Sequence, residues 1–310
     1  MEIKKYREDY KTLWDRHIRQ SKNGTFLLLR DFIEYHGDRF ADHSLLFYED
    51  NELLSVLPGH IQDDIFFTHA GLTYGGFALS TSLHCTQVLS MFDLLSDHLK
   101  RMKVKKIVYK AIPHIYHKYP SEEDLYALFY HNARLEARNI SSSIFLDNKL
   151  PYSKLRKRGI SKARKNNIRI EESSNFDAFW QILENNLRSK YDTKPVHTLN
   201  EICYLKKKFS DEIKLYVSVN DKNEITAGSV VFITSTVIHI QYIAANEQGI
   251  QTGATDLLID FIITQYQDKR YFDYGISTED GGRYLNENLI SQKEGFGARA
   301  TVYDIYSIDL

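Results

Sequence analysis

The residues best suited to chemistry lie together near the C-terminal end of the chain, at 271–299 (YFDYGISTEDGGRYLNENLISQKEGFGAR). This stretch begins with an aromatic, strand-like run at 271–275, and two acids with two glycines then predict a loop at 277–282. The sequence K-E-G-F-G follows at 293–297, before another strand-like run. Carboxylates and a lysine between two apolar strands could move a proton or stabilise a developing charge. The alternative is a glycine-rich connection between two strands.

The composition is typical of a soluble globular protein with no overall preference for nucleic acid or anionic membranes. Of 310 residues, 43% are hydrophobic and 26% are charged, and the net charge is −1. The two cysteines, Cys85 and Cys203, form no CxxC pair, so we expect a reducing compartment without a disulfide framework. The charged N-terminus shows no signal peptide and no apolar run approaches a membrane span, which favours the cytoplasm.

The elements that must position these residues occur twice along the chain. Two helices, three strands, a further helix and a further strand are predicted between residues 10 and 111, and the same order returns between 176 and 275. Residues 122–138 are predicted to be helical. We infer an internal duplication, with domains at 1–150 and 151–310. Hairpin strands followed by a strand–helix–strand crossover predict an α/β (α+β) fold, in which each domain is a mixed, mostly antiparallel sheet flanked by helices.

This duplicated plan resembles the GNAT (Gcn5-related N-acetyltransferase) fold in its tandem form, as in FemAB-like and BioF2-like acyltransferases. The sequence S-K-A-R-K-N-N-I at 161–168 is similar to the opening of that family's second domain, and K-E-G-F-G at 293–297 is similar to its K-x-x-F-G. The resemblance implies an enzyme that forms an amide on an amino sugar, a sugar nucleotide or a peptidoglycan precursor. Since no G-x-S-x-G motif occurs, we expect direct attack on the donor without a covalent acyl-enzyme.

The resemblance also implies catalytic roles for four residues. Lys293 would bind the donor or stabilise the oxyanion, and the alternative is a surface lysine. Asp273 and Glu279 would act as a general base or hold the attacking ammonium, and the alternative is a pair of acids that solvate a turn. Tyr303 would protonate the leaving group, and the alternative is a core tyrosine.

Five further residues are expected to bind substrate. Arg283 would pair with an acceptor carboxylate or phosphate, or would instead form a salt bridge with Glu279. His239 would carry a proton, or would be a satisfied histidine within a strand. The remaining candidates line the donor or acceptor pocket: Gln241, Tyr242 and Asn286.

In the GNAT fold, backbone amides at a helix N-terminus bind the pyrophosphate of CoA. The corresponding turn here is 248–254 (QGIQTGA), so the resemblance makes Gln251, Thr252, Gly253 and Ala254 the expected cofactor-binding residues. Acyl-CoA, chiefly acetyl-CoA, is the favoured co-substrate. Aminoacyl-tRNA is the other candidate donor, less favoured because the chain has no heptad-bearing arm and is nearly neutral.

A basic segment at 154–165 (KLRKRGISKARK) begins the second domain, and seven of its twelve residues are lysine or arginine. It would bind phosphate groups or form a solvated linker helix. No metal is expected, because His114 and His117 have no further ligands at suitable spacing. We assign donor binding and catalysis to the second domain, and acceptor binding or a structural role to the first. The alternative is a catalytically decayed GNAT fold that serves as a binding or scaffolding protein; the oligomeric state is left open.

Overall fold

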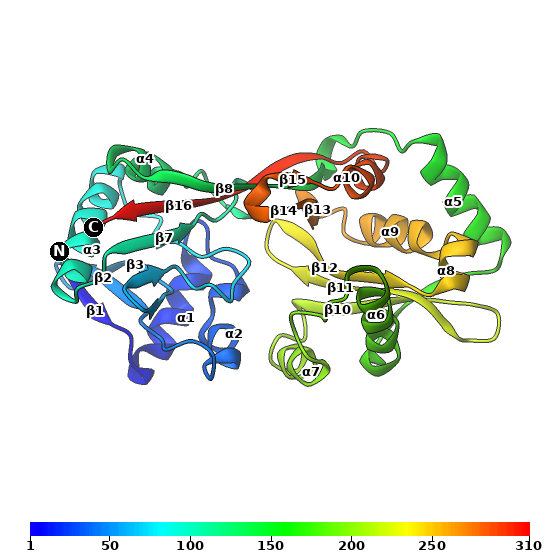
Figure 1. Cartoon of the computed structure of the whole chain (residues 1–310), viewed down its shortest axis with the longest axis horizontal. Helices are drawn as coiled ribbons and strands as arrows, with labels where there is room; N and C mark the ends of the chain where they lie inside the picture. Colours follow the sequence, from blue (N-terminus) through cyan, green and yellow to red (C-terminus); the bar gives the residue numbers. More distant parts are fainter. The chain divides into compact units, whose positions relative to one another are not determined.

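The computed structural model describes residues 1–310, except for the side chains of residues 190 and 191, and divides them into two compact units (Figure 1). Unit 2 comprises Ser141–Ser277 and Asn286–Ala300, and all other residues belong to unit 1. The observed boundary therefore lies ten residues before the predicted one at 150/151, and two C-terminal segments return to unit 1. The physical reason is one long strand, β8 (Arg134–Phe145), whose first part belongs to unit 1 and whose last part belongs to unit 2.

Two sheets form the frame of unit 1. The first has the order β1-β2-β3-β6 and is antiparallel throughout. The second has the order β4-β5-β7-β16-β8. In the second sheet β5 and β7 run parallel, because helix α3 (Cys85–Arg101) connects them as a crossover. The strands are β1 (Glu2–Lys5), β2 (Leu45–Glu49), β3 (Glu52–Leu57), β4 (His60–Gln62), β5 (Ile65–Phe67), β6 (Ala78–Leu79), β7 (Lys106–Lys110) and β16 (Arg299–Asp309).

Helix α4 corrects one prediction from the sequence. It covers Glu123–Tyr130, and the residues from Arg134 onwards, which were predicted to be helical, form β8. The helix ends because Asn132 adopts the left-handed conformation with φ of 54°, which asparagine tolerates better than most residues. The other helices of unit 1 are α1 (Lys11–Gln20) and α2 (Arg30–Ile33), and two short strands complete it: β14 (Thr278–Glu279) and β15 (Tyr284–Leu285).

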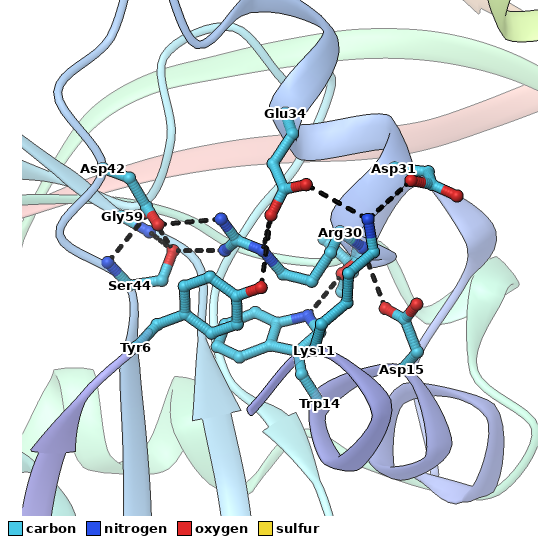
Figure 2. Close-up of polar contacts among 11 residues, drawn as sticks. Tyr6, Lys11, Trp14, Asp15, Arg30, Asp31, Glu34, Asp42, Ser44 and Gly59 are labelled. Atoms are coloured by element: carbon cyan, nitrogen blue, oxygen red, sulfur yellow. Dashed lines mark hydrogen bonds and ion pairs between the residues drawn. The ribbon is translucent and has the colours of Figure 1, made fainter. Parts of the chain in front are cut away.

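Arg30 anchors the N-terminal part of unit 1 from inside the core (Figure 2). Its side chain is fully buried, and the guanidinium lies over the ring of Tyr6 at 3.6 Å. It donates hydrogen bonds to Glu34 at 3.0 Å, to the hydroxyl of Ser44 at 3.1 Å and to Asp42 at 2.7 Å. The guanidinium therefore ties α2 to the segment before β2, since its fork satisfies several acceptors at once.

Three buried imidazoles lie close to this network. The ring centroids of His36 and His69 are 4.8 Å apart, and those of His60 and His69 are 5.5 Å apart. All three side chains are at most 2% exposed. Burial lowers the pKa of His69 to about 2, and the neighbouring His36, His60 and Arg30 add to this effect. Burial also lowers the pKa of His60. The folded protein therefore keeps His60 and His69 neutral.

Acid is expected to destabilise unit 1 because of His60 and His69. In the unfolded chain each imidazole binds a proton below about pH 6.5, whereas in the folded chain it does not. The free energy of unfolding therefore decreases by about 1.4 kcal/mol per ring for each pH unit below this value. Urea unfolding at several values between about pH 7.5 and about pH 5 measures this slope. His69→Phe should remove one ring's share of the slope, and His114→Gln, at an exposed position, should not. An unchanged slope in His69→Phe would contradict the assignment.

One sheet with helices on both faces forms unit 2. Its order is β8-β13-β12-β11-β10-β9, and β12 and β13 are its one parallel pair among these strands. In Figure 1, α8 and α9 lie on one face of this sheet and α6 and α7 on the other. Its strands are β9 (Arg169–Ser173), β10 (Ile213–Val219), β11 (Ile225–Ile233), β12 (Val237–Ala245) and β13 (Tyr271–Ile276). Its helices are α5 (Lys154–Lys165), α6 (Phe176–Tyr191), α7 (Leu199–Lys208), α8 (Glu247–Thr252), α9 (Ala254–Gln265) and α10 (Glu287–Glu294).

The main core of unit 2 lies between the sheet and helices α5 and α9. Ile160 and Ala163 of α5 pack with Leu258 and Ile262 of α9 against buried strand residues such as Phe272. The basic face predicted for residues 154–165 is exposed on α5, because the apolar positions of that helix point into this core. No helix in the described part of the chain is both long enough and apolar enough to span a bilayer.

Candidate active site

Strands β12 and β13 separate in the middle of the unit 2 sheet. They pair in parallel at Val237–Tyr271, Ile238–Phe272 and His239–Asp273, and both strands then continue without further pairing to each other. Beyond this point a cavity of about 510 Å³ opens beside β12. Its walls come from β12, α6, the α8–α9 junction, α10 and Arg156 of α5. Apolar and polar side chains both line it, and the apolar ones include Leu187, Ile243, Ala245, Ile250 and Leu289. A cleft of this size and lining is typical of a small-molecule site.

A buried carboxylate lies at the last paired position. Asp273 is fully buried, and its Oδ1 accepts hydrogen bonds from the hydroxyls of Ser141 at 2.6 Å and Ser143 at 2.8 Å. Its Oδ2 lies 2.8 Å from Nδ1 of His239. Burial alone would raise the pKa of Asp273, but the hydrogen bonds from His239 and the two serines outweigh burial and lower it. Asp273 is therefore a charged acceptor and not one of the solvated turn acids that the sequence left open.

The ionised Asp273 fixes the tautomer of His239. Since the carboxylate has only acceptor positions, Nδ1 of the imidazole carries the hydrogen, and Nε2 of the neutral ring carries the lone pair. In the neutral form of the ring, Nε2 is therefore the atom that a general base would use. It is 9% exposed and lies on β12, four residues before Ile243 in the wall of the cleft. At ~3.3 Å per residue this separation is ~13 Å along the strand.

Lys293 is buried, so it is not the surface lysine that the sequence allowed. It lies in α10, and its Nζ donates to the carbonyl of Gly275 at 2.7 Å, the carbonyl of Ile276 at 2.9 Å and the hydroxyl of Ser277 at 2.8 Å. Burial lowers the pKa of Lys293 to about 8, although the charge of Asp273 acts in the opposite direction. All three ammonium hydrogens are used, so Lys293 holds the end of β13 in place and polarises the hydroxyl of Ser277.

Lys293→Met is expected to lower both stability and activity. The substitution leaves the three oxygens at the end of β13 without their donor, which costs about 1–3 kcal/mol of unfolding free energy. Urea unfolding measures this loss, and a transfer assay measures the accompanying loss of rate. Lys222→Met removes an exposed lysine at a turn and should stay within about 0.5 kcal/mol of the parent protein. Equal stabilities of the two variants would contradict the bonding at Lys293.

Gln241 and Tyr242 lie between His239 and the cleft. The register of β11 with β12 shifts here, from Val230–Tyr242 to Val231–Ile240, so Gln241 is the extra residue of a β-bulge. A bulge leaves its extra residue outside the regular ladder, which makes its backbone amide a candidate donor. The hydroxyl of Tyr242 instead contacts His197, with an Nδ1 to oxygen distance of 2.6 Å.

The expected cofactor-binding residues do not form an open turn. Gln251 and Thr252 belong to α8, where the Thr252 hydroxyl donates to the carbonyl of Gln248 and the Gln251 amide contacts Glu247. Gly253, with φ of 81°, ends α8 and begins α9, and its N–H is donated to α8 carbonyls. Ala254 is fully buried. A role in cofactor binding stays a prediction for these four residues.

Four other predicted residues have different positions. Asn286 caps α10 by accepting from the N–H of Leu289 at 3.1 Å. Tyr303 is a buried residue of unit 1, and its hydroxyl lies 2.8 Å from that of Tyr116. Glu279 and Arg283 are exposed residues of unit 1, and no salt bridge joins them among the side chains that the structure describes. The structure thus groups Lys293, Asp273 and His239, while the roles of the other residues stay predictions.

Sequence reasoning missed three serines and one ion pair of unit 2. Ser141 and Ser143 hold Asp273, and their alternate spacing in S-S-S-I-F places both on one face of β8. Ser277 accepts from Lys293. Arg156 of α5 pairs with Asp256 of α9 at 2.6 Å, and only the tertiary structure brings these helices together. No cluster of histidine, cysteine and carboxylate side chains suited to a metal occurs among the described residues.

Unit 1 contains the same parallel arrangement without a comparable polar centre. Strands β5 and β7 pair at three positions that end at Phe67–Val108. The next residue of β7, Tyr109, is fully buried and packs against Phe77 and Phe92. Its hydroxyl donates to Asp124 at 2.6 Å and accepts from the N–H of Phe77 at 2.9 Å. At the last paired position, where unit 2 has His239 and Asp273, unit 1 has Phe67 and Val108, which cannot transfer a proton.

These features define a tandem GNAT-like fold of the FemAB type, as the sequence predicted: each unit has a parallel pair joined by a crossover helix, and the strands of unit 2 separate beside a cleft. The structure is similar to that of FemX, with a TM-score of 0.72 at 10% sequence identity over 100% of this chain and 98% of FemX. No protein-family model matches the sequence, and no curated protein matches it either.

Two further solved structures share this fold. The C-terminal domain of a putative lysylphosphatidylglycerol synthetase from Agrobacterium fabrum has a TM-score of 0.64 at 11% identity, over 97% of this chain and 93% of that domain. A tandem GNAT protein from the clavulanic acid biosynthesis pathway has a TM-score of 0.51 at 9% identity, over 99% and 98% of the two chains. The similarity in all three cases is one of fold.

Proposed function

We propose that the protein is an acyltransferase with its active centre in unit 2. In this proposal it transfers an acyl group, in particular an aminoacyl group, from an activated donor to an amine and forms an amide. The observation that carries the proposal is the buried His239–Asp273 pair at the point where β12 and β13 separate. The cleft farther along β12 would bind the donor and direct its reactive carbonyl towards His239.

The proposed reaction is a direct displacement. The acceptor nitrogen attacks the carbonyl carbon, the new C–N bond forms, and Nε2 of His239 takes the proton that the nitrogen loses. The backbone N–H of Gln241 in the bulge would stabilise the oxyanion, and the carbonyl forms again as the bond to the leaving group breaks. His239 then returns the proton to the leaving atom. Asp273 stabilises the imidazolium between these two proton transfers.

The acceptor we propose is a precursor of the cell envelope that carries an amino group. The support is the fold that this chain shares with FemX and with the domain of a putative lysylphosphatidylglycerol synthetase. Lysylphosphatidylglycerol is, by its name, the lysyl derivative of a phospholipid. The exposed basic face of α5 would attract the phosphate groups that such precursors carry; its members include Lys154, Arg158, Lys162 and Lys165. Unit 1 would then have a structural or acceptor-binding role, since Phe67 and Val108 occupy the position equivalent to the His239–Asp273 pair of unit 2.

A panel of donors and acceptors tests this function. The protein is incubated with acetyl-CoA or a mixed aminoacyl-tRNA pool and with peptidoglycan precursors or UDP-linked amino sugars, and mass spectrometry detects the mass added to the acceptor. We expect transfer from at least one donor, and we expect His239→Gln to reduce it by about 10²–10⁴-fold. If no pair reacts and no donor raises the melting temperature, the acyltransferase proposal is wrong and the scaffolding alternative stands.

A further inference from the structure

The α8–α9 junction contains an anion of its own where a GNAT fold would bind the pyrophosphate of CoA. Asp256 lies in the first turn of α9, the position where the helix dipole favours negative charge. Its Oδ1 accepts a hydrogen bond from the guanidinium of Arg156 at 2.6 Å. Both side chains are at most 15% exposed, and both residues line the cleft. Asp256 thus neutralises the one arginine of the described cleft lining, the side chain that could otherwise pair with a diphosphate.

The backbone of α5 covers the same turn. A Cβ atom on Gly253 would lie 2.5 Å from the carbonyl oxygen of Gly159, and a Cβ atom on Gly159 would lie 1.8 Å from Oδ2 of Asp256. Two glycines therefore permit α5 and the start of α9 to approach until their backbones touch. This approach places a carbonyl oxygen, and not an N–H donor, against the junction.

The amides of the junction are already largely bonded. The N–H of Gly249 is donated to the side chain of Asn246, and that of Ile250 to the backbone carbonyl of Asn246. The N–H of Gly253 is donated to carbonyls of α8, and that of Asp256 to the carbonyl of Gly253. An anion site at a helix N-terminus needs several unbonded N–H groups directed at the ligand, and these four are already bonded within the chain.

We propose that the Asp256–Arg156 pair excludes the pyrophosphate of CoA from this cleft, so that the donor is not a CoA thioester. The junction residues do not fit the group that the fold family implies: Asp256 already neutralises the guanidinium, the covering backbone presents a carbonyl, and four amides are bonded within the chain. The donor instead presents an acyl or aminoacyl group without a diphosphate at this position. This inference rests on the proposed function only in taking the cleft as the donor site.

Binding of CoA fragments tests the inference without any turnover. Isothermal titration calorimetry compares CoA with pantetheine, which has the same thiol arm and no phosphates. We expect the two affinities to agree within a factor of about three, because the phosphates find no site. If CoA binds more than about tenfold more tightly than pantetheine, the junction accepts the pyrophosphate and the inference is overturned. This comparison uses the unaltered protein.

An Asp256 variant tests whether the Asp256–Arg156 pair is what excludes the pyrophosphate. Asp256→Asn removes the carboxylate and leaves the Arg156 guanidinium to pair with an added anion. The affinity of this variant for inorganic pyrophosphate should therefore be about tenfold or more higher than that of the parent protein. Added salt should weaken this binding. Asp260→Asn is the matched control, because Asp260 pairs with Arg164 between the same two helices at an exposed position, and it should leave pyrophosphate binding unchanged. The double variant Asp256→Asn/Arg156→Gln should bind pyrophosphate no more tightly than the parent protein does.

The outcomes separate the two proposals. A folded Asp256→Asn protein that gains no pyrophosphate affinity would refute the role of the ion pair, whatever its transfer activity. Transfer from an aminoacyl donor together with equal CoA and pantetheine affinities would support both proposals. Absence of transfer from every donor would overturn the acyltransferase function and leave the binding result intact.

Discussion

His239→Gln is expected to reduce transfer by about 10²–10⁴-fold while the protein remains folded, since this is the usual contribution of a positioned general base. Glutamine can still donate a hydrogen bond to Asp273, so the buried carboxylate keeps a partner. It cannot accept a proton from the attacking amine. Steady-state kinetics should show the loss mainly in kcat, because the cleft wall that begins at Ile243 is unchanged.

Two further variants make this result specific. Asp273→Asn should also be impaired, because an amide can donate as well as accept and no longer fixes the hydrogen on Nδ1 of His239. Glu279→Gln alters an exposed carboxylate of unit 1, and its effect decides whether this predicted catalytic residue takes part. If His239→Gln retains more than about a fifth of the parent kcat, the imidazole is not the general base.

Arg30→Met is expected to lower the free energy of unfolding by about 3 kcal/mol. This is the largest effect that we expect on stability. Methionine keeps much of the apolar stem but removes the hydrogen bonds to Glu34, Ser44 and Asp42, and the contact over Tyr6 (Figure 2). The hydroxyl of Ser44 is buried and loses a donor. Both carboxylates keep about a third or more of their surface in water, so they remain hydrated and limit the loss.

Lys11→Met is the matched control for this network. Lys11 donates to Glu34 at 3.2 Å and to Asp31 at 2.7 Å, but its side chain is about one-third exposed. An ion pair in contact with solvent contributes about 0–1 kcal/mol, so Lys11→Met should cost much less than Arg30→Met. Guanidinium unfolding of the two variants at one pH measures the difference. Equal losses would show that burial of Arg30 does not decide the energetics.

The fold could be predicted from the sequence because its periodic patterns repeat. Apolar residues at helical and strand spacing predict the same order of elements in both halves, and this order restricts the sheet to a small number of topologies. The K-E-G-F-G sequence likewise singled out Lys293, which the structure places next to the end of β13. Local pattern suffices in these cases because each signal extends over only a few consecutive residues.

Local pattern failed where distant contacts decide the outcome. Residues 134–139 (RLEARN) contain good helix formers, yet they form β8, because backbone pairing within the sheet outweighs a weak intrinsic preference. The division of the chain after Ile140 likewise depends on distant contacts. Intrinsic helix propensities differ by only a few tenths of a kcal/mol per residue, so a sheet ladder overrides them.

The sequence by itself determined the duplicated α/β plan and the basic helix, and it singled out Lys293 as a candidate. Only the tertiary structure decided that Asp273 binds His239 and two serines of β8, about 130 residues away in the chain. It also decided that Arg156 and Asp256 meet at the α8–α9 junction. The physical reason is that charge and hydrogen bonding act through space, so the chemistry of a carboxylate depends on partners that its neighbours in the sequence do not reveal.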